Sequence, residues 1–488
     1  MLSVDELREA CSICLGYRGV LYERYMEVLE RWLSGGESGV DLLGRYIQVV
    51  SSLIFSAEGV VFDFSGSGGR ALSEEEGRLI EGLRRRVVDD FWEEGLDEVF
   101  YRCAKDGELF GLIGLMVVPV VEGGRVLGMR KYLMYPWDVM FLYPELDVDD
   151  SSQVIVRVVR MGRREAVRRF GEEVVGRARE VGGGLGFLGR VERVNVGEGG
   201  VEVGVDRRRE LFRRYLIGQG GKDVVEVYEV WYKDEDGRVC VGVLVGDEVV
   251  EHRVNPFLDD DYPFGFYVSE PIVGTVYGRG AGDRALVLQE RVDYWMEAME
   301  GAVQLFARPP LLLQAYQGIL DREEVVRELE RPGGVVLIDS PDMRVEHYLP
   351  KVDLQAILGI LEKYERNLLE TVGLSDLVLG ANVKGVRSAS HAQLIAMFAG
   401  SHLKAKALRF EQFIERVMTL WARMLTQFDE RYYDVRFPFK VEVYAHTSSP
   451  IMALNYQELL LNLFEIGAIG ADVLIEMLPI PFRWKVRR

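Results

Sequence analysis

The chain has 488 residues, with 59 lysines and arginines against 78 aspartates and glutamates, so its formal net charge at pH 7 is -19. A surface that grips DNA through its phosphates or bases is basic, and this composition argues against that class of protein. A channel with an acidic inner surface would still suit DNA that passes through it, because the surface repels the polyanion and does not bind it. The solubility of a large acidic protein explains the charge more simply.

The chain carries no signal for secretion, membrane insertion or disulfide bonding. Its first ten residues, MLSVDELREA, lack the basic start and apolar core of a signal peptide. The longest apolar run, 109–121, is interrupted by glycines and a proline and is too short to span a bilayer. Cys11 and Cys14 have no second cysteine pair to complete a zinc site. We therefore expect a soluble protein with no membrane partner, in which these two cysteines lie in a packed helix turn.

The N-terminal part of the chain alternates helical patterns with short strands. Two capping boxes, Ser3 with Glu6 and Ser73 with Glu76, predict helix starts. From residue 115 the apolar period changes to two on both sides of a Glu-Gly-Gly turn, which predicts a hairpin. The expected elements are helices at 3–33, 41–56, from 74 and around 96–103, a strand at 59–64, a flexible loop at 65–69, and hairpin strands at 115–121 and 125–133.

A β-meander is expected next. The glycine-rich interval 181–221 is poorly patterned, and we expect a loop or mobile insertion there. The acidic run Asp259–Asp261 lacks the EF-hand spacing, so a solvated turn is favoured over a cation site. The expected elements are strands at 154–160, 224–232, 238–245 and 248–254 and a charged helix at 163–174.

Two helices enclose a small module further along the chain. After GRGAG at 278–282, apolar residues at alternating steps of four and three predict a helix over Asp283–Phe306, which Pro309 and Pro310 end. A returning helix is predicted over Asp353–Leu369. The module between them is expected to contain strands at 311–313, 335–338 and 345–348 and a short helix at 321–329.

The longest periodic segment is Ser390–Phe428. Ser390 with Gln393 matches a capping box, and apolar residues then recur at steps of three and four, with charged residues such as Lys406 largely between them. At about 1.5 Å per residue this helix would span roughly 55–60 Å. We expect it to need a partner of equal length or copies of itself, as in oligomeric assemblies. A strand at 441–445 and helices at 454–464 and 471–477 complete the expected elements.

The sequence assembles no catalytic set. GQGGKD at 218–223 approaches a phosphate-binding loop, but its lysine is followed by aspartate and its first glycine is misplaced. His391 and His402 are about 16 Å apart along one helix, too far to share a metal, and are expected to be ordinary surface or packing residues. Serine-hydrolase and zinc-protease motifs are also absent. We therefore expect no enzymatic activity, no catalytic residue, no metal and no cofactor.

The order of the predicted elements resembles the portal, or head-to-tail connector, proteins of tailed bacteriophages. The likeness covers roughly 90–428, and the first ninety residues and the insertion at 181–221 match less well. Four strings are also similar to that family: VYEVWYKDEDG at 227–237, YGRGAGDRAL at 277–286, ARPP at 307–310 and GVRSASHAQ at 385–393.

The resemblance implies an α+β, portal-like fold that is mainly helical. Its stem helices would pack against each other and against neighbouring subunits, and its clip strands would pair between subunits and so hide their edges. The implied parts are an α/β wing at 1–280, a first stem helix at 281–307, a clip at 308–349, a second stem helix at 350–371, a tunnel loop and long wing helix at 372–428, and a crown at 429–488.

The resemblance also implies a function and a set of partners. The protein would form a homo-oligomeric ring, usually of twelve subunits, at one capsid vertex of the virion, and would assemble in the host cytoplasm. Double-stranded DNA would be packaged and ejected through the ring. The implied protein partners are the terminase large subunit, the major capsid and scaffolding proteins, and head-tail adaptor proteins.

The tunnel loop, Gly373–Ser388, would face the DNA. We expect Lys384 and Arg387 to contact the phosphate backbone without sequence preference, with Asn382 as a neutral polar neighbour. Alternatively, the two cations pair with acidic residues of an adjacent subunit. Two other functions stay open: an oligomeric virion protein without a DNA channel, and an enzyme with an unrecognised site.

Overall fold

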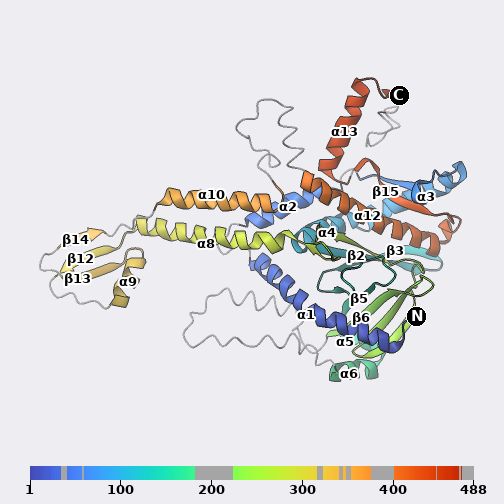
Figure 1. The fold of residues 1–488 in the computed structure, drawn as a ribbon, viewed down its shortest axis with the longest axis horizontal. Helices are drawn as coiled ribbons and strands as arrows, with labels where there is room; N and C mark the ends of the chain where they lie inside the picture. The colour runs from blue at the N-terminus through green and yellow to red at the C-terminus, as the bar shows by residue number, and fades with distance from the viewer. Residues whose placement is uncertain are drawn as a thin grey trace. The chain divides into compact units, whose positions relative to one another are not determined.

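The computed structural model describes residues 1–34, 41–57, 60–181, 224–315, 322–339, 344–347, 353–374, 401–446, 448–471 and 474. They form an α+β protein, as expected, and Figure 1 labels its elements. The chain divides into two compact units. The first comprises Met1–Ser34, Tyr46–Asp283 and Gly373–Arg488, and the second comprises Gly35–Arg45 and Arg284–Val372.

The largest sheet of the first unit has five antiparallel strands in the order β4-β5-β6-β7-β8. Its last three strands confirm the predicted meander. Every residue of β7 is buried, which shows that both faces of the sheet are covered at its centre. The strands are β4 (Val139–Phe141), β5 (Val154–Gly162), β6 (Val224–Lys233), β7 (Val239–Val245) and β8 (Glu248–Val254).

Helix α1 (Val4–Ser34) packs against β4, β5 and β6. It begins at the predicted capping box, in which Ser3 N donates to Glu6 Oε2 at 2.7 Å and Glu6 N donates to Ser3 Oγ at 3.3 Å. Cys11 and Cys14 are buried free thiols in the core between α1 and the sheet. Burial raises the pKa of the Cys14 thiol to about 12, so the thiol stays protonated at neutral pH. The predicted packed helix turn is therefore confirmed.

A second sheet of the first unit has three strands in the order β3-β2-β9. Strands β2 (Leu112–Glu122) and β3 (Arg125–Met134) form the predicted hairpin, and β9 (Phe264–Val268) pairs antiparallel with β2. The hairpin turns at Gly123 and Gly124, whose φ angles are 56° and 74°. Positive φ at both turn residues matches the twist of the flanking strands, and glycine adopts it without strain.

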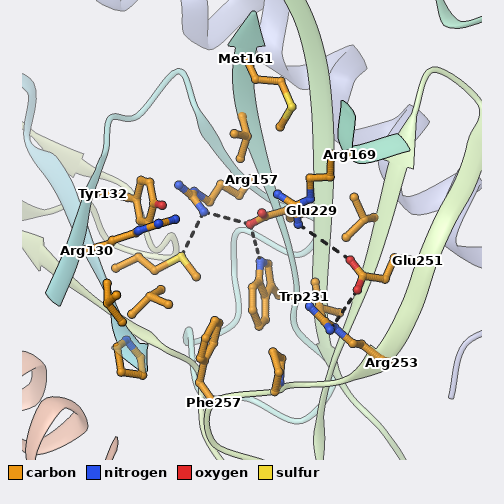
Figure 2. A pocket seen from close by; sticks show the side chains of 18 of the residues that line it. Arg130, Tyr132, Arg157, Met161, Arg169, Glu229, Trp231, Glu251, Arg253 and Phe257 are labelled. Carbon is orange, nitrogen blue, oxygen red and sulfur yellow. Dashed lines mark hydrogen bonds and ion pairs between the residues drawn. The ribbon is translucent and has the colours of Figure 1, made fainter. Parts of the chain in front are cut away.

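The two sheets share one hydrophobic core, to which they contribute buried side chains such as Met116 and Trp231. A pocket of about 580 Å³, lined by residues of both sheets and of the segments beside them, remains between the sheets (Figure 2).

The predicted charged helix at 163–174 is two helices in the structure, α5 (Arg163–Phe170) and α6 (Glu172–Val181). Gly171 separates them with φ of 90° and ψ of 154°. The single-helix prediction is wrong because the charge pattern continues through a glycine whose backbone leaves the helical region.

Helices α3 (Glu74–Glu93) and α4 (Leu96–Phe110) lead into β2. The Ser73–Glu76 capping box is confirmed, since each residue accepts a hydrogen bond from the other's backbone amide. Helix α4 continues beyond the predicted 96–103 and ends at Gly111, where φ is 84°. A Cβ at Gly111 would lie 2.6 Å from the backbone of Gly278, so the chain can cross itself closely only at a glycine.

The long helix α12 (Ser401–Phe428) is covered from several sides within the first unit, by β2, β9, β15 (Phe439–Val443) and α3. Within Ser401–Phe428, short elements of the same chain bury the helix, so this part has the cover that was expected from an equally long partner or from copies of the helix. Its predicted apolar stripe is confirmed by side chains that are at most 2% exposed: Leu403, Ala407, Phe410, Ile414, Val417, Trp421 and Met424.

Three further predictions concern two helices and a loop. The predicted helix at 41–56 is α2 (Leu42–Ile54), and the predicted helix at 454–464 lies within α13 (Pro450–Glu465). The predicted flexible loop at 65–69 is partly wrong, since β1 (Phe62–Gly66) extends into it and pairs antiparallel with β15. A distant strand supplies hydrogen-bond partners that the local sequence does not reveal.

The second unit has the predicted order of a helix, a small module and a returning helix. In the module, β12 lies between β13, with which it is parallel, and β14, with which it is antiparallel. Asp353 caps the returning helix, accepting hydrogen bonds from the amides of Gln355 and Ala356. The elements are α8 (Ala281–Ala307), whose first three residues belong to the first unit, β12 (Leu311–Ala315), α9 (Arg322–Glu330), β13 (Val335–Asp339), β14 (Arg344–His347) and α10 (Leu354–Thr371).

Several predictions concern residues outside the described ones. They are nearly the whole insertion at 181–221, the GQGGKD string, the capping box at Ser390, the first part of the long helix, and most of the helix at 471–477. No helix within the described ranges is long and apolar enough to cross a membrane.

Candidate functional site at the start of the long helix

The residues expected to face DNA, Asn382, Lys384 and Arg387, lie outside the described residues, and their role stays a prediction. The structure describes the chain up to Leu374 and again from Ser401. A Cβ placed on Gly373 would lie 3.1 Å from His402 Nδ1. The two ends of the interval 375–400 therefore meet in the first unit, at the start of α12.

The first of these ends is held in a conformation that suits only glycine. Gly373 has φ of 80°, and the next side chain, Leu374, is 2% exposed. An L-residue at this φ places its Cβ too close to its own carbonyl oxygen. The backbone at the base of the predicted tunnel loop is thus fixed on one side by a glycine turn and a buried leucine.

The other end is fixed by a buried ion pair. Lys406, in the second turn of α12, places Nζ 2.5 Å from Oε2 of Glu108 in α4, and both side chains are 1% exposed. Glu108 Oε1 accepts hydrogen bonds from Tyr267 Oη at 2.5 Å and from Ser269 Oγ at 2.6 Å. The carboxylate is therefore saturated with donors, which is the condition under which a buried charge is tolerated.

Electrostatics of this cluster keep Glu108 ionised. Burial alone would raise the pKa of Glu108, but the Lys406 ammonium and the hydroxyls of Ser269 and Tyr267 outweigh burial and hold the pKa below its ordinary value. Burial and the neighbouring carboxylate raise the pKa of Tyr267 well above its ordinary value, so its hydroxyl remains a donor.

A second acid extends the cluster towards the protein surface. Glu270 Oε1 lies 3.3 Å from Lys406 Nζ and 3.6 Å from Nε2 of His402. Burial and the Lys406 charge lower the pKa of His402, whose side chain is half exposed. His402 is thus neutral near pH 7 and lies at the edge of the cluster, in agreement with the expected surface or packing role. His391, its predicted neighbour along the helix, lies outside the described residues.

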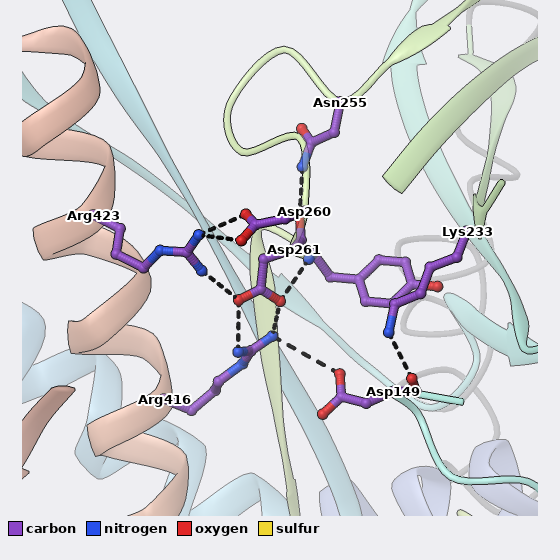
Figure 3. Close-up of polar contacts among 8 residues, drawn as sticks. Asp149, Lys233, Asn255, Asp260, Asp261, Arg416 and Arg423 are labelled. Carbon is purple, nitrogen blue, oxygen red and sulfur yellow. Dashed lines mark hydrogen bonds and ion pairs between the residues drawn. The ribbon is translucent and has the colours of Figure 1, made fainter. Parts of the chain in front are cut away.

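Two arginines of α12 contact the acidic turn at 259–261, for which the sequence predicts a solvated role. Figure 3 shows Arg416 and Arg423 pointing towards Asp260 and Asp261. Arg423 Nη1 lies 2.8 Å from Asp261 Oδ2, and its Nη2 lies 2.5 Å from Asp260 Oδ1. Arg416 donates to Asp261 through both terminal guanidinium nitrogens, Nη1 and Nη2, and the Nη1 bond to Oδ2 is 2.9 Å long. Both acids bind arginine side chains of α12, but only Asp261 is largely buried, at 16% side-chain exposure. Asp260 is 63% exposed and Asp259 is also exposed, so the predicted solvated turn is confirmed for these two residues and wrong for Asp261.

A third charged contact joins α12 to the segment that follows β15. Glu411 is 8% exposed at its side chain and accepts a hydrogen bond from Ser448 Oγ at 3.1 Å, while His446 Nδ1 lies 2.8 Å from its other oxygen. Burial raises the pKa of Glu411, and the bond to His446 opposes that rise. Lys406 and Glu411, two charged residues of α12, are therefore buried with partners from other segments of the chain.

The arrangement holds the start of α12 in place. The buried Lys406 and Glu108 form a closed pair, and no group of three potential metal ligands occurs within the part of the chain that the structure describes. Sequence reasoning missed this cluster because it treated Lys406 as a polar position of α12. The seven-residue spacing of Arg416 and Arg423, which puts them on one helix face, is the signal that could have indicated the acidic partner.

The second unit has a different character, because its long helices keep apolar side chains at the surface. On α8, Tyr294 is 60% exposed and Val303 is 49% exposed, and on α10 Leu358 is 48% exposed. Among the described residues of α10, only Leu368 and Leu369 are buried. These helices therefore differ from α12, whose apolar residues are covered within the chain.

Comparison with known proteins adds little to this picture. No protein-family model matches the chain, and no curated protein is similar to it. Among solved structures, a chain of the structure described as "Virion of native gene transfer agent (GTA) particle" is similar over 93% of this chain and 94% of that chain, with a TM-score of 0.43 and 12% sequence identity. Both values are too low to establish a shared fold or function.

Proposed function

We propose that the chain is the subunit of a viral portal, a ring of about twelve copies at one capsid vertex. In this proposal double-stranded DNA enters and leaves the capsid through the ring, and terminase and head-tail adaptor proteins dock on it in turn. The major capsid and scaffolding proteins surround the ring during assembly in the host cytoplasm. The chain itself catalyses no reaction.

The incomplete burial of α8 carries the proposal. Of the apolar residues that recur along this helix at steps of four and three, Val292 and Ala302 are buried, whereas Leu288, Trp295, Met299 and Phe306 are half buried. Soluble proteins seldom expose contiguous apolar surface unless another molecule covers it. In a ring each copy presents the same surfaces to its neighbours, so pairs of α8 and α10 helices can cover one another around the axis.

The small module of the second unit supports the same assembly. Its three-stranded sheet ends in β13 and β14, and among the described strands no other strand pairs with their outer edges. Exposed strand edges attract further strands, so proteins cover or pair them. Pairing between neighbouring subunits would cover these edges and join the modules into a continuous belt.

The anchored start of α12 supports the DNA-facing role of the loop before it. Both ends of the interval 375–400 meet beside the Lys406–Glu108 pair, so a loop there would project from a rigid base. Lys384 and Arg387 would then meet DNA as a ring of weak cationic contacts within an otherwise acidic protein of net charge -19. Such contacts favour sliding over tight binding.

The assembly state tests the proposal. Native mass spectrometry and negative-stain imaging of the purified chain should show closed rings with a central hole. Substituting Tyr294→Glu with Val303→Glu should abolish them, because charges would replace the exposed apolar residues of α8. Leu79→Glu with Val4→Glu is the matched control, since these residues are 38% and 44% exposed on helices of the first unit.

A chain that stays monomeric or dimeric at high concentration contradicts the proposal. So does a Tyr294→Glu, Val303→Glu variant that assembles as the wild type does. Closed assemblies without a lumen would favour the alternative, an oligomeric virion protein that conducts no DNA.

A further inference from the structure

The pocket between the two sheets of the first unit is built differently from the rest of this acidic chain. Among its lining residues are five arginines and three glutamates: Arg130, Arg157, Arg160, Arg169, Arg253, Glu165, Glu229 and Glu251. Its volume of about 580 Å³ lies in the range of pockets that hold small ligands or short peptide segments. Arg160 is already paired with Asp138 at 3.1 Å and with Glu226 at 3.4 Å. The other four arginines still outnumber the three glutamates, which favours an anionic ligand.

Figure 2 shows the labelled charges in two groups on either side of Trp231. On one side, the 8% exposed Arg157 lies 3.0 Å from Glu229 Oε2 and 5.1 Å from the centroid of the Tyr132 ring, and Arg130 lies close by. Within the described residues Arg130 forms no ion pair. Two arginines and one glutamate leave this group with one excess positive charge.

The second group of charged side chains lies on the other side of Trp231 and contains Arg169, Glu251 and Arg253. Arg253 Nη1 lies 3.0 Å from Glu251 Oε1, and Arg169 Nη2 lies 3.9 Å from Glu251 Oε2. The two arginine side chains are 49% and 51% exposed, so a ligand can reach them. These three side chains carry one more positive charge than negative, and Glu165, a described residue that also lines the pocket, forms no ion pair with either arginine.

Apolar side chains occupy the space between the two groups. Trp231 is 2% exposed and directs its Nε1 to Glu229 Oε2 at 3.4 Å, so its indole is held in one orientation. Phe257, Val241 and Val243 line the same region. One compact anion, such as phosphate, cannot neutralise two separated cationic groups or use the apolar surface between them.

We propose that this pocket binds an extended acidic peptide segment of a partner protein, in which two carboxylate side chains flank an apolar one. The apolar side chain contacts Phe257, between the two charged groups. One carboxylate pairs with the Arg130–Arg157 group and the other with the Arg169–Arg253 group, in the bidentate geometry that arginine offers to carboxylates. The inference rests on the pocket alone and does not require the portal function.

Isothermal titration calorimetry of the purified full chain at low ionic strength tests this inference. The probe is the peptide acetyl-Glu-Gly-Phe-Gly-Glu-amide, and the comparison peptides replace both glutamates with glutamine or the phenylalanine with serine. The first peptide should bind, and each replacement should weaken binding at least about tenfold, because a charge-assisted hydrogen bond or the apolar contact is lost. Binding should also weaken with added salt.

Two variants localise the binding. Arg130→Ala with Arg253→Ala should weaken it at least about tenfold, since one exposed arginine is removed from each group. Arg78→Ala with Arg85→Ala, on α3 and 78% and 74% exposed, makes the same change in net charge and should leave binding unaltered. Circular dichroism melting confirms that both variants are folded.

Three outcomes overturn the inference. The first is no binding of the diglutamate peptide, and the second is equal binding of the diglutamine peptide. The third is inorganic phosphate that binds at the same arginines and is not displaced by the peptide, which would identify the pocket as a site for a compact anion. The comparison among peptides needs no variant, so a misfolded variant would not leave the question undecided.

Discussion

Lys406 Nζ lies 2.5 Å from Glu108 Oε2, and the pair joins α12 to α4 across 298 residues of sequence. Both side chains are 1% exposed, so each contacts the other and neighbouring polar groups in place of water. A buried ion pair fixes the rotation of a helix about its axis, because turning α12 would leave two charges without partners. The pair therefore sets the direction in which the chain leaves α12 towards the predicted tunnel loop.

Removing the lysine should destabilise the first unit. We expect Lys406→Met to lower the free energy of unfolding by about 3–5 kcal/mol, because Glu108 is then buried without its cation. Urea unfolding followed by circular dichroism measures the loss. Lys404→Met, two residues earlier on the same helix and partly exposed, should change stability by no more than about 0.5 kcal/mol. Adding Glu108→Gln to Lys406→Met should restore much of the loss, and an additive further loss would contradict the pairing.

The same pair predicts a dependence of stability on pH. The folded pKa of Glu108 lies below its ordinary value of 4.5, because Lys406 and two hydroxyls outweigh the effect of burial. A carboxyl with a lowered folded pKa stabilises the fold above its unfolded pKa and loses that contribution as the pH falls through the folded value. Wild-type stability should therefore drop more steeply below pH 4.5 than that of Glu108→Gln. Parallel stability profiles below that pH would refute the assignment.

A substitution of Gly373 tests how firmly the chain is held just before the predicted tunnel loop. Gly373→Ala should cost about 1–2 kcal/mol of stability, because its φ of 80° strains an L-residue and the new methyl group would lie 3.1 Å from His402 Nδ1. Gly77→Ala in α3 is the control, since a Cβ there meets no atom within 4 Å and should stabilise the helix by up to about 1 kcal/mol. Denaturant unfolding compares the two. Equal effects would mean that the base is not constrained.

A double-mutant cycle tests the contact between α12 and the acidic turn. Arg416→Ala and Asp261→Ala should show a coupling energy of about 1–3 kcal/mol, because the pair is partly buried at 33% and 16% side-chain exposure. The cycle on Arg78 and Glu74, which are 78% and 85% exposed, should give less than about 0.5 kcal/mol. A coupling near zero for Arg416 and Asp261 would return Asp261 to the solvated role expected from the sequence.

The DNA-facing role of the loop remains a prediction that packaging assays can test. Lys384→Glu with Arg387→Glu should leave ring assembly intact and reduce DNA packaging or retention, because a ring of new negative charges repels the phosphate backbone. The charge-matched control is Arg78→Glu with Arg85→Glu on α3. Packaging that is unchanged relative to this control would remove Lys384 and Arg387 from the DNA-facing role.

The sequence predicted most of the helices and strands correctly, because their signals are local. These signals depend on neighbours within a few positions. They are the capping boxes at Ser3 and Ser73, the Gly-Gly turn of the hairpin and the two-residue period of the meander. The wrong predictions arise from contacts between residues that are far apart in sequence. The β1 strand at 62–66 forms because β15 supplies its partners, and β15 lies far away in the chain.

The candidate site shows the same division between local signals and contacts that are distant in sequence. Composition and spacing identified Asp259–Asp261 and Lys406 as charged positions, but the contacts of Asp261 and Lys406 join residues 155 and 298 apart in sequence. The periodicity of α12 establishes that one face is apolar and does not say what covers the other faces. Only the tertiary structure decided that this helix is buried within its own chain while apolar residues of α8 and α10 remain exposed, because burial depends on which distant segments pack together and not on the helix itself.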